Sequence, residues 1–486
     1  MSDYNFATYD RETKVWTGTI GSYKFPMDVY IGEQLLTALD KTPDRIIQIN
    51  HEEKTELLCK DLKVSSIRVA QNLQKLGIQP DDIVGFICQN SHHVNALVYG
   101  CVLIGAVINP LHVSFTKDGI KQMFSQTKPK LVICDSKVYE TTREALNELG
   151  NEAKIFTLLR EIPGVSHVDE LLATTGIESE FVPPKFDKPA DKKLFGILCS
   201  SGTTGAPVFF FLMIASNSSQ FFHSQKGVCM PHVLVLSFID PSDSSVSAPI
   251  SRSFSFSPIY WGSGLLSMVL SAFNYGETKI VTMKPFSVDL CAKLIEKYHP
   301  TSIQLNPAAM LPFLNSSYVN SLDFTGVKMF MCTGSIVSEE LRRKFKSIFP
   351  EKPLVIFYGM TEVPISAMFP SSDYGGLKVG KIVSSIYLKV VDDEGNKLEN
   401  GEKGEIRAKF EFGFAGYFNN PEETAEAIDE EGYFKTGDLG HLDDDGNIFV
   451  LGRNKDIFKY KGYHVREKLA FLKFSNLFNS LTGFPT

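Results

Sequence analysis

Strand and helix patterns alternate along two long stretches of this chain, and this alternation restricts the fold more than any other feature of the sequence. In the first stretch, an apolar strand pattern at 82–88 precedes a buried helix pattern that runs into a second strand over 94–108. An amphipathic helix pattern at 115–127 and a strand pattern at 130–135 follow. Strands that alternate with helices form parallel sheets covered by helices.

The same alternation returns between residues 278 and 349. The helix pattern at 287–300 begins with Ser287, whose hydroxyl suits an N-cap, and stops at Pro300, which cannot continue a helix. The remaining elements of this stretch are strands at 278–283, 301–305 and 328–334 and a helix at 338–349. We therefore expect an α/β fold whose large N-terminal region contains two doubly wound sheets.

Beyond about residue 380 the pattern changes to short strands separated by turn residues. These strands are predicted within 387–398, 404–410 and 443–452. Such spacing indicates a small β subdomain. We accordingly divide this part of the chain into an α/β region over 1–380 and a β subdomain over 381–452.

Charge and composition exclude several classes of protein. The chain carries 49 basic and 56 acidic residues, for a net charge of −7, and no basic block suggests a nucleic-acid partner. Its eight cysteines are scattered without a CxxC pair, which argues against a disulfide framework or a zinc site. The apolar runs are shorter than the ~20 residues of a membrane span, and residues 1–18 lack the apolar core of a signal peptide. We expect a cytoplasmic protein.

A loop rich in glycine and hydroxyl side chains, SSGTTGAP, begins at Ser200. Small residues let backbone N–H groups and hydroxyls approach phosphate oxygens closely. The same residues also form ordinary turns, and the loop lacks the G-x-x-x-x-G-K-[ST] pattern of a Walker A motif. By itself it favours a phosphate site only weakly.

Three further motifs offer groups that suit a nucleotide. In FYGMTE, Tyr358 provides a ring for stacking on a base, Thr361 a hydroxyl for phosphate and Glu362 an oxygen ligand for Mg²⁺. In YFKTGDLG, Asp438 can accept both hydroxyls of a ribose. The fourth motif is basic and contains Arg453, Lys455, Lys459 and Lys461. Each motif taken singly has an ordinary alternative, such as a surface turn, a capping acid or a solvated run of charge.

In this order the four motifs resemble those of the adenylate-forming (AMP-binding) superfamily of acyl-CoA synthetases, 4-coumarate-CoA ligases and beetle luciferases. The resemblance covers most of residues 12–207 and 226–465. It implies that the chain joins a carboxylic acid to AMP, using ATP and Mg²⁺, and then transfers the acyl group to coenzyme A. The partners implied are therefore small molecules, and the oligomeric state stays open.

The resemblance also implies a role for each motif residue. The phosphate clamp would comprise Ser200, Ser201, Gly202, Thr203, Thr204, Gly205 and Lys226. The adenine pocket would comprise Gly334, Ser335, Ile336, Tyr358 and Gly359. Thr361 would touch the α-phosphate and Glu362 would hold Mg²⁺, so that the catalytic set is Lys226, Thr203, Thr361 and Glu362. Asp438 and Arg453 would bind the ribose, and Lys455 would occupy the hinge. We expect Thr203, Thr361, Glu362, Asp438 and Arg453 to converge on one cleft.

The segment FSPIYWGSGLLSM is similar to the family's acyl-pocket motif and contains Tyr260, Trp261 and Gly264. The alternative is that these aromatic residues belong to an ordinary core. Luciferases carry a pair of histidines where this chain has Tyr260 and Trp261. The difference disfavours a light-emitting monooxygenase and favours a ligase for fatty or aryl acids.

The phosphate loop is interrupted by Val208–Gln225, since its removal leaves the uninterrupted motif SSGTTGAPKGVCMPH. A Val codon begins with GT and a Gln codon can end with AG, so the segment has the marks of a retained in-frame intron. The alternative is a genuine insertion. We expect it to form a poorly packed surface excursion, because its apolar residues lack the alternation of a half-buried strand.

After KGYHV the chain also departs from the family pattern. The resemblance implies a hinge and the start of a C-terminal domain at 453–465, followed by a non-family tail at 466–486. Most of the family's small C-terminal α/β domain, with its catalytic lysine, would be missing, as would the family's peroxisomal C-terminal signal. We expect this chain to make acyl-CoA poorly even after removal of Val208–Gln225. A catalytically dead nucleotide-binding pseudoenzyme stays open as an alternative.

Overall fold

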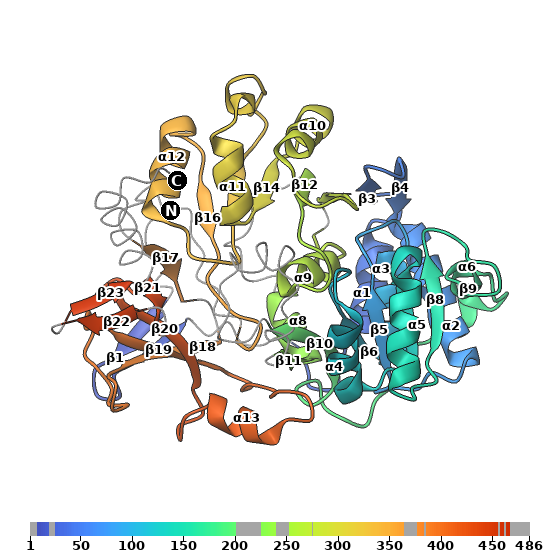
Figure 1. The fold of residues 1–486 in the computed structure, drawn as a ribbon, viewed down its shortest axis with the longest axis horizontal. Coiled ribbons are helices and arrows are strands. Elements are labelled where there is room, and N and C mark those ends of the chain that lie inside the picture. Colours follow the sequence, from blue (N-terminus) through green and yellow to red (C-terminus); the bar gives the residue numbers. More distant parts are fainter. Residues whose placement is uncertain are drawn as a thin grey trace, which may run out of the picture.

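Three seven-stranded sheets form the framework of the protein (Figure 1). In a computed structural model of the chain, the described residues are 7–18, 25–200, 225–239, 252–274, 276–363, 377–382 and 385–454, together with the backbone of 457–460 and 463–466. A two-stranded antiparallel hairpin, β22 (Ile457–Tyr460) with β23 (Tyr463–Arg466), accompanies the three sheets.

The first sheet has the strand order β11-β10-β6-β5-β7-β8-β9. These strands are β5 (Ile83–Ile87), β6 (Val107–Pro110), β7 (Leu131–Asp135), β8 (Lys154–Leu158), β9 (Ser166–His167), β10 (Leu194–Ser200) and β11 (Lys226–Pro231). Its central strands are parallel, and β11 pairs antiparallel with β10 at the edge. The helices beside it are α1 (Ile31–Lys41), α2 (Cys59–Lys75), α3 (Val94–Leu103), α4 (Lys117–Thr127), α5 (Tyr139–Glu148), α6 (Asp169–Leu172) and α8 (His232–Leu236).

Both faces of this sheet are buried, as a doubly wound fold requires. In β7, Leu131 and Ile133 join the large core that contains residues of α2 and α3. The alternate residues Val132 and Cys134 join a second core with residues of α4 and α5. Side chains of a strand point alternately to opposite faces, so helices cover the sheet on both sides.

The second sheet has the order β16-β15-β14-β12-β13-β3-β4. Its strands are β3 (Ile46–Asn50), β4 (Thr55–Leu58), β12 (Arg252–Ser255), β13 (Thr278–Val281), β14 (Ser302–Leu305), β15 (Met329–Cys332) and β16 (Leu354–Ile356). All pairs are parallel except β3 with β4. Its helices are α9 (Gly262–Leu270), α10 (Val288–Tyr298), α11 (Pro307–Leu314) and α12 (Glu339–Ile348). The two α/β sheets are thus mixed, with antiparallel edges that the alternation pattern did not predict.

The third sheet is antiparallel throughout and has the order β1-β2-β18-β19-β20-β21-β17. Its strands are β1 (Ala7–Asp10), β2 (Val15–Gly18), β17 (Lys378–Lys381), β18 (Ile386–Val391), β19 (Gly404–Phe410), β20 (Phe434–Leu442) and β21 (Asn447–Arg453). Helix α13 (Pro421–Ala427) lies in the connection between β19 and β20. Because β1 and β2 come from the start of the chain, this sheet draws on more of the sequence than residues 381–452.

The helix predicted over 287–300 shows how local signals set its ends. The Ser287 hydroxyl accepts a hydrogen bond from the backbone N–H of Leu290 at 3.2 Å. His299 closes the helix in the left-handed conformation, with φ of 44°, directly before Pro300. Both ends therefore lie where capping and proline chemistry place them.

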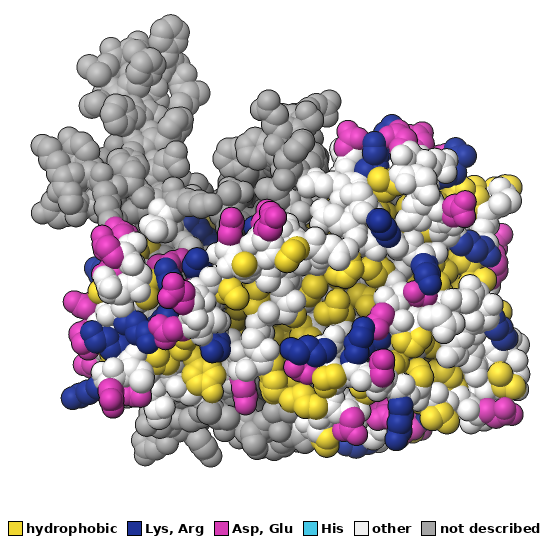
Figure 2. Space-filling model, turned by 90° about the horizontal axis from the view of Figure 1, so that it is seen from below, with side chains coloured by type: hydrophobic (Ala, Val, Ile, Leu, Met, Phe, Trp, Pro, Cys, Tyr) yellow, Lys and Arg dark blue, Asp and Glu magenta, His cyan; other side chains and the backbone are white. Residues whose placement is uncertain are grey.

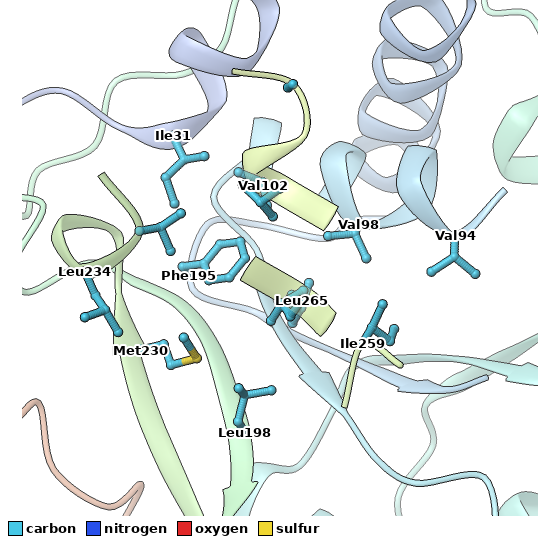
Figure 3. Packing of buried hydrophobic residues seen from close by; sticks show 14 of the residues in the cluster. Ile31, Val94, Val98, Val102, Phe195, Leu198, Met230, Leu234, Ile259 and Leu265 are labelled. Atoms are coloured by element: carbon cyan, nitrogen blue, oxygen red, sulfur yellow. The ribbon is translucent and has the colours of Figure 1, made fainter. Parts of the chain in front are cut away.

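Helices α3 and α9 share a core with the β10–β11 hairpin (Figure 3). Figure 3 shows Val94, Val98 and Val102 along one stripe of α3, close to Leu265 of α9. The four-residue spacing puts these valines on one helix face.

Among the described residues, no helix has the length and apolar character needed to cross a membrane. On the face drawn in Figure 2, Lys and Arg side chains are interspersed with Asp and Glu.

Candidate active site

The β10–β11 hairpin brings together the two ends of the interrupted glycine-rich loop. Ser200 and Lys226 are directly opposite each other as the last cross-strand pair of the hairpin. The ends of β10 and β11 therefore lie side by side, which keeps the two halves of the motif adjacent. Several predicted residues lie outside the described part of the chain: Ser201, Gly202, Thr203, Thr204, Gly205 and Lys455. Val208–Gln225, for which a surface excursion is predicted, also lies outside the described residues, except for Gln225.

Three predicted nucleotide ligands from distant segments meet at Asp438 on β20. The Tyr358 hydroxyl donates to Asp438 Oδ2 at 2.7 Å, and Arg453 Nε lies 3.0 Å from Asp438 Oδ1. Burial, together with the neighbouring Asp438 carboxylate, raises the pKa of Tyr358 well above its ordinary value. The tyrosine therefore stays a neutral hydrogen-bond donor, and Asp438 is fixed from two sides.

Thr436, which the sequence motifs did not single out, holds the backbone around Asp438. It is fully buried, and its Oγ1 accepts the backbone N–H of Asp438 at 3.0 Å. Its carbonyl accepts a hydrogen bond from Arg453 Nη1 at 2.8 Å, so Thr436 positions both ends of the Asp438–Arg453 pair. Gly437, between the two residues, has φ of 68°, which a side chain would strain.

Glu362 forms a second cluster with Tyr417, a residue that sequence reasoning missed. The Tyr417 hydroxyl donates to Glu362 Oε1 at 3.2 Å. Burial raises the pKa of Glu362, against smaller lowering effects from Tyr417, Ser200 and the charge of Arg453. Glu362 therefore lies within electrostatic reach of the hairpin end at Ser200 and of Arg453 in the Asp438 cluster. The only sequence signal for Tyr417 is an aromatic residue after a glycine, which is common in turns.

Lys226 extends this cluster. Its Nζ lies 2.6 Å from Glu423 Oε2 and 4.6 Å from the centre of the Tyr417 ring. Burial and the Glu362 charge raise the pKa of Tyr417, which keeps its hydroxyl a donor. Lys226, Tyr417 and Glu362 therefore form a continuous chain of contacts, with Glu423 as the present partner of the ammonium group.

The predicted adenine-side segments lie side by side at the carboxyl ends of two parallel strands. Thr333, after β15, donates its hydroxyl to the carbonyl of Phe357, after β16, at 3.3 Å. Gly334 has φ of 99°, and Ile336 exposes 41% of its surface, much for a large apolar residue. Such an edge of an open sheet is where ligands bind in α/β folds. Gly334, Ser335 and Gly359 are also exposed, and Thr361 is half-buried.

The predicted acyl-pocket residues form a separate aromatic group at the start of α9. The ring of Tyr260 lies 4.3 Å from that of His112 and 6.0 Å from that of Trp261, which is 43% exposed. Burial lowers the pKa of His112 to about 4, so this histidine, which the motifs did not reveal, is neutral. Gly264 packs against the carbonyl of Pro258, where a Cβ would lie only 2.1 Å from the oxygen.

Several known proteins are similar to this chain in sequence. A family model described as "AMP-binding enzyme" matches residues 35–418. The chain is 27% identical to 4-coumarate-CoA ligase 1 of Narcissus pseudonarcissus, over 92% of this chain and 80% of that protein. It is 28% identical to a 4-coumarate-CoA ligase of Vanilla planifolia, over 90% of this chain and 79% of that protein.

Solved structures extend the likeness to the fold. A luciferase-like enzyme from the nonluminescent mealworm Zophobas morio aligns with a TM-score of 0.77 and 25% identity, over 90% of this chain and 99% of that one. ATP-bound MatB from Rhodopseudomonas palustris aligns with a TM-score of 0.73 and 24% identity, over 90% of this chain and 82% of that one. At 24% identity, the similarity to MatB concerns the fold alone.

Proposed function

Because this chain belongs to the AMP-binding enzyme family of adenylate-forming acid–CoA ligases, we propose that its two residue clusters hold the two ends of ATP. The nucleoside cluster is Tyr358, Asp438 and Arg453; the phosphate cluster is Lys226, Tyr417 and Glu362. The observation that carries the proposal is that residues far apart in the sequence are in contact within each cluster. Asp438 lies 2.7 Å from the Tyr358 hydroxyl and 3.0 Å from Arg453 Nε. The Tyr417 hydroxyl lies 3.2 Å from Glu362 Oε1, and the centre of its ring lies 4.6 Å from Lys226 Nζ.

In the nucleoside cluster, Asp438 accepts the ribose hydroxyls. Its carboxylate is already oriented by Tyr358 and Arg453, so binding the ribose costs little reorganisation. The flat ring of Tyr358 then offers its face to adenine beside the exposed Gly334–Ile336 segment. The exposure of Ile336 supports this assignment, since an apolar side chain at an open strand end suits a base.

The phosphate cluster neutralises the charge that develops as pyrophosphate leaves. The acid's carboxylate oxygen attacks the α-phosphorus, an O–P bond forms to give the acyl-adenylate, and the bond from the α-phosphorus to the bridging oxygen breaks. Such phosphoryl chemistry is catalysed mainly by positioning and by opposite charge. Lys226 supplies that charge once it exchanges Glu423 for a phosphate oxygen, and the Thr203 and Thr361 hydroxyls are assigned to the phosphates.

Glu362 suits a magnesium ligand by its chemistry. It makes no ion pair within the described residues, while Tyr417 orients one carboxylate oxygen and burial raises its pKa. A bound Mg²⁺ would favour the ionised form of this carboxyl and offset the charge of the phosphates. Coenzyme A is the proposed acyl acceptor, and the acid, fatty or aryl, is assigned to the segment of Tyr260, Trp261 and Gly264.

The test is acid-dependent release of pyrophosphate from ATP by the full chain, with fatty and aryl acids supplied separately. We expect release that depends on the acid and that falls at least 10-fold in Lys226→Met and in Asp438→Asn. The second product should be the acyl-adenylate, which yields AMP once coenzyme A is added. ATP binding without pyrophosphate release from any acid would instead support the pseudoenzyme alternative. Two observations speak for this alternative. Lys226 already has an ion-pair partner in Glu423, and the phosphate loop is interrupted at Val208–Gln225.

A further inference from the structure

A histidine and two carboxylates meet at the outer edge of the first sheet, where β9 is the last strand (Figure 1). Glu161 lies in the loop after β8, His167 in β9 and Asp169 at the start of α6. One ring nitrogen of His167 and one carboxylate oxygen from each acid all lie within 4.8 Å of one another. Strand β11, which begins with Lys226, is at the opposite end of the same sheet, so these three residues are separate from the phosphate cluster.

The spacing of these three atoms suits a single transition-metal ion. Zinc binds histidine nitrogen and carboxylate oxygen at about 2.0–2.2 Å, so two ligand atoms on one zinc ion are at most about 4.4 Å apart. Both acids are exposed at the surface, where small rotations of their side chains can close the remaining difference. The three ligand atoms are therefore close to a coordinating arrangement.

The two carboxylates also lack the usual cationic partners. Within the described part of the chain, neither Glu161 nor Asp169 forms an ion pair with a lysine or an arginine, whereas the adjacent Glu170 lies 3.6 Å from Lys154 Nζ. Two like charges held this close repel each other. A divalent cation between them would remove that repulsion.

The imidazole of His167 has the capacity for one more bond. Its Nδ1 lies 3.1 Å from Asp169 Oδ2 and accepts the Asp169 backbone N–H at 3.4 Å, while its Nε2 is enclosed and has no hydrogen-bond partner within the described residues. A metal-binding histidine commonly uses one ring nitrogen for the metal and the other for a carboxylate or a backbone group. A second imidazole, that of His93 before α3, lies within electrostatic reach of His167 and Asp169.

We propose that Glu161, His167 and Asp169 form a binding site for a divalent transition-metal ion of the zinc type. A mixed set of imidazole and carboxylate suits zinc better than Mg²⁺ or Ca²⁺, which take oxygen ligands. The ion joins the loop after β8 to β9 and α6, and so fixes this edge of the sheet. The site differs from that of Glu362, the proposed magnesium ligand, and it does not depend on the proposed function.

Calorimetric titration of Zn²⁺ into the full chain, stripped of metal with a chelator and kept reduced, tests the proposal. We expect binding that weakens at least about 10-fold in His167→Gln and in Asp169→Asn, since even residues that only orient a ligand change metal affinity by about 10–100-fold. The matched control is His299→Gln, at an exposed histidine after α10, which should bind like the unaltered chain. An equal concentration of Mg²⁺ should not displace the zinc.

Hydrogen exchange then locates the ion. Zinc should slow amide exchange within residues 159–169 of the unaltered chain, and His167→Gln should abolish this slowing. Circular dichroism checks that each variant is folded, and Asp169→Asn decides the question if His167→Gln is not. Absence of zinc binding by the unaltered chain, binding that survives the substitutions, slowing confined to other segments, or displacement by Mg²⁺ would each overturn the inference.

Discussion

The backbone at Asp438 is held in place by a hydrogen bond to the Thr436 hydroxyl. No contact with the nucleotide is assigned to the Thr436 side chain. Its hydroxyl accepts the Asp438 backbone N–H, and its carbonyl accepts a hydrogen bond from Arg453. We predict that Thr436→Val weakens ATP binding about 10-fold, because the hydroxyl that holds Asp438 is lost; that ratio corresponds to about 1.4 kcal/mol. Isothermal titration calorimetry measures the effect.

The matched control for this residue is Thr436→Ser, which keeps the hydroxyl and should restore most of the affinity. If valine and serine variants bind ATP equally well while both remain folded, Thr436 has no positioning role.

A second residue-scale prediction concerns the buried carboxyl of Asp135, at the end of β7. Burial raises its pKa to about 6 from 3.8, against smaller effects of the Gln89 N–H and Lys137. A carboxyl whose pKa is higher in the folded than in the unfolded state stabilises the fold at pH values below the unfolded-state pKa. This contribution to the free energy of unfolding is lost as the pH rises through about 6. Asp135→Asn removes this loss, so its unfolding free energy should exceed that of the unaltered chain by about 3 kcal/mol at pH 7.5.

Urea unfolding of both proteins at pH 4 and pH 7.5 measures this difference. The gain should shrink toward zero at pH 4, where the carboxyl is largely protonated when folded. A gain that is the same at both pH values would show that ionisation of Asp135 is not its cause.

At the scale of elements, α9 is positioned by the close approach of Gly264 to Pro258. A Cβ at Gly264 would lie 2.1 Å from the Pro258 carbonyl oxygen, which is far inside van der Waals contact. We predict that Gly264→Ala lowers the free energy of unfolding by about 1–3 kcal/mol, the usual cost of overpacking. Differential scanning calorimetry provides the measurement.

Gly262, two residues earlier and the first residue of the same helix, is the matched control. A Cβ there would meet only Leu198 Cδ1 at 3.6 Å, an ordinary contact, so Gly262→Ala should be nearly neutral. Equal destabilisation by both alanines would point to helix propensity or backbone entropy instead of packing against Pro258.

Elements with strong local signals were predictable from the sequence, and elements defined by distant pairing were not. Helix α10 was predicted because Ser287 and Pro300 mark its ends, and β7 because its apolar run is buried on both faces. Nothing in the sequence near β2 indicates that it pairs with β18, because that register joins residues as far apart in the chain as Trp16 and Leu388.

The candidate site divides in the same way. Tyr358, Asp438 and Arg453 were predicted because each lies in a distinctive motif, and the structure joins them. Tyr417 and His112 were missed because their importance comes from contacts with residues far away in the chain. Thr436 was missed because its role is to hold the backbone of Asp438 and the side chain of Arg453, which a motif does not reveal. Their types are common in strands and turns, so periodicity alone could not identify them.

At the scale of the whole molecule, the phosphate cluster depends on a loop that leaves the hairpin at Ser200 and returns at Lys226. We predict that deletion of Val208–Gln225 strengthens ATP binding, because a shorter loop restricts the glycine-rich segment next to Lys226 and lowers the entropy cost of ordering it. Calorimetric titration of ATP into both proteins gives the comparison. Unchanged or weaker binding by the deletion variant would mean that the segment does not disturb the phosphate site.

We infer that one nucleotide bridges the Asp438 cluster and the Lys226 cluster. Titration of ATP and AMP into the unaltered chain, Asp438→Asn and Lys226→Met provides the test. We predict that Asp438→Asn weakens binding of both nucleotides by a similar factor, because each has the ribose. Lys226→Met should weaken ATP at least 10-fold and leave AMP nearly unchanged, because AMP lacks the phosphates that Lys226 contacts. If Lys226→Met weakened AMP as much as ATP, or Asp438→Asn weakened neither, the two clusters would not hold the two ends of one nucleotide.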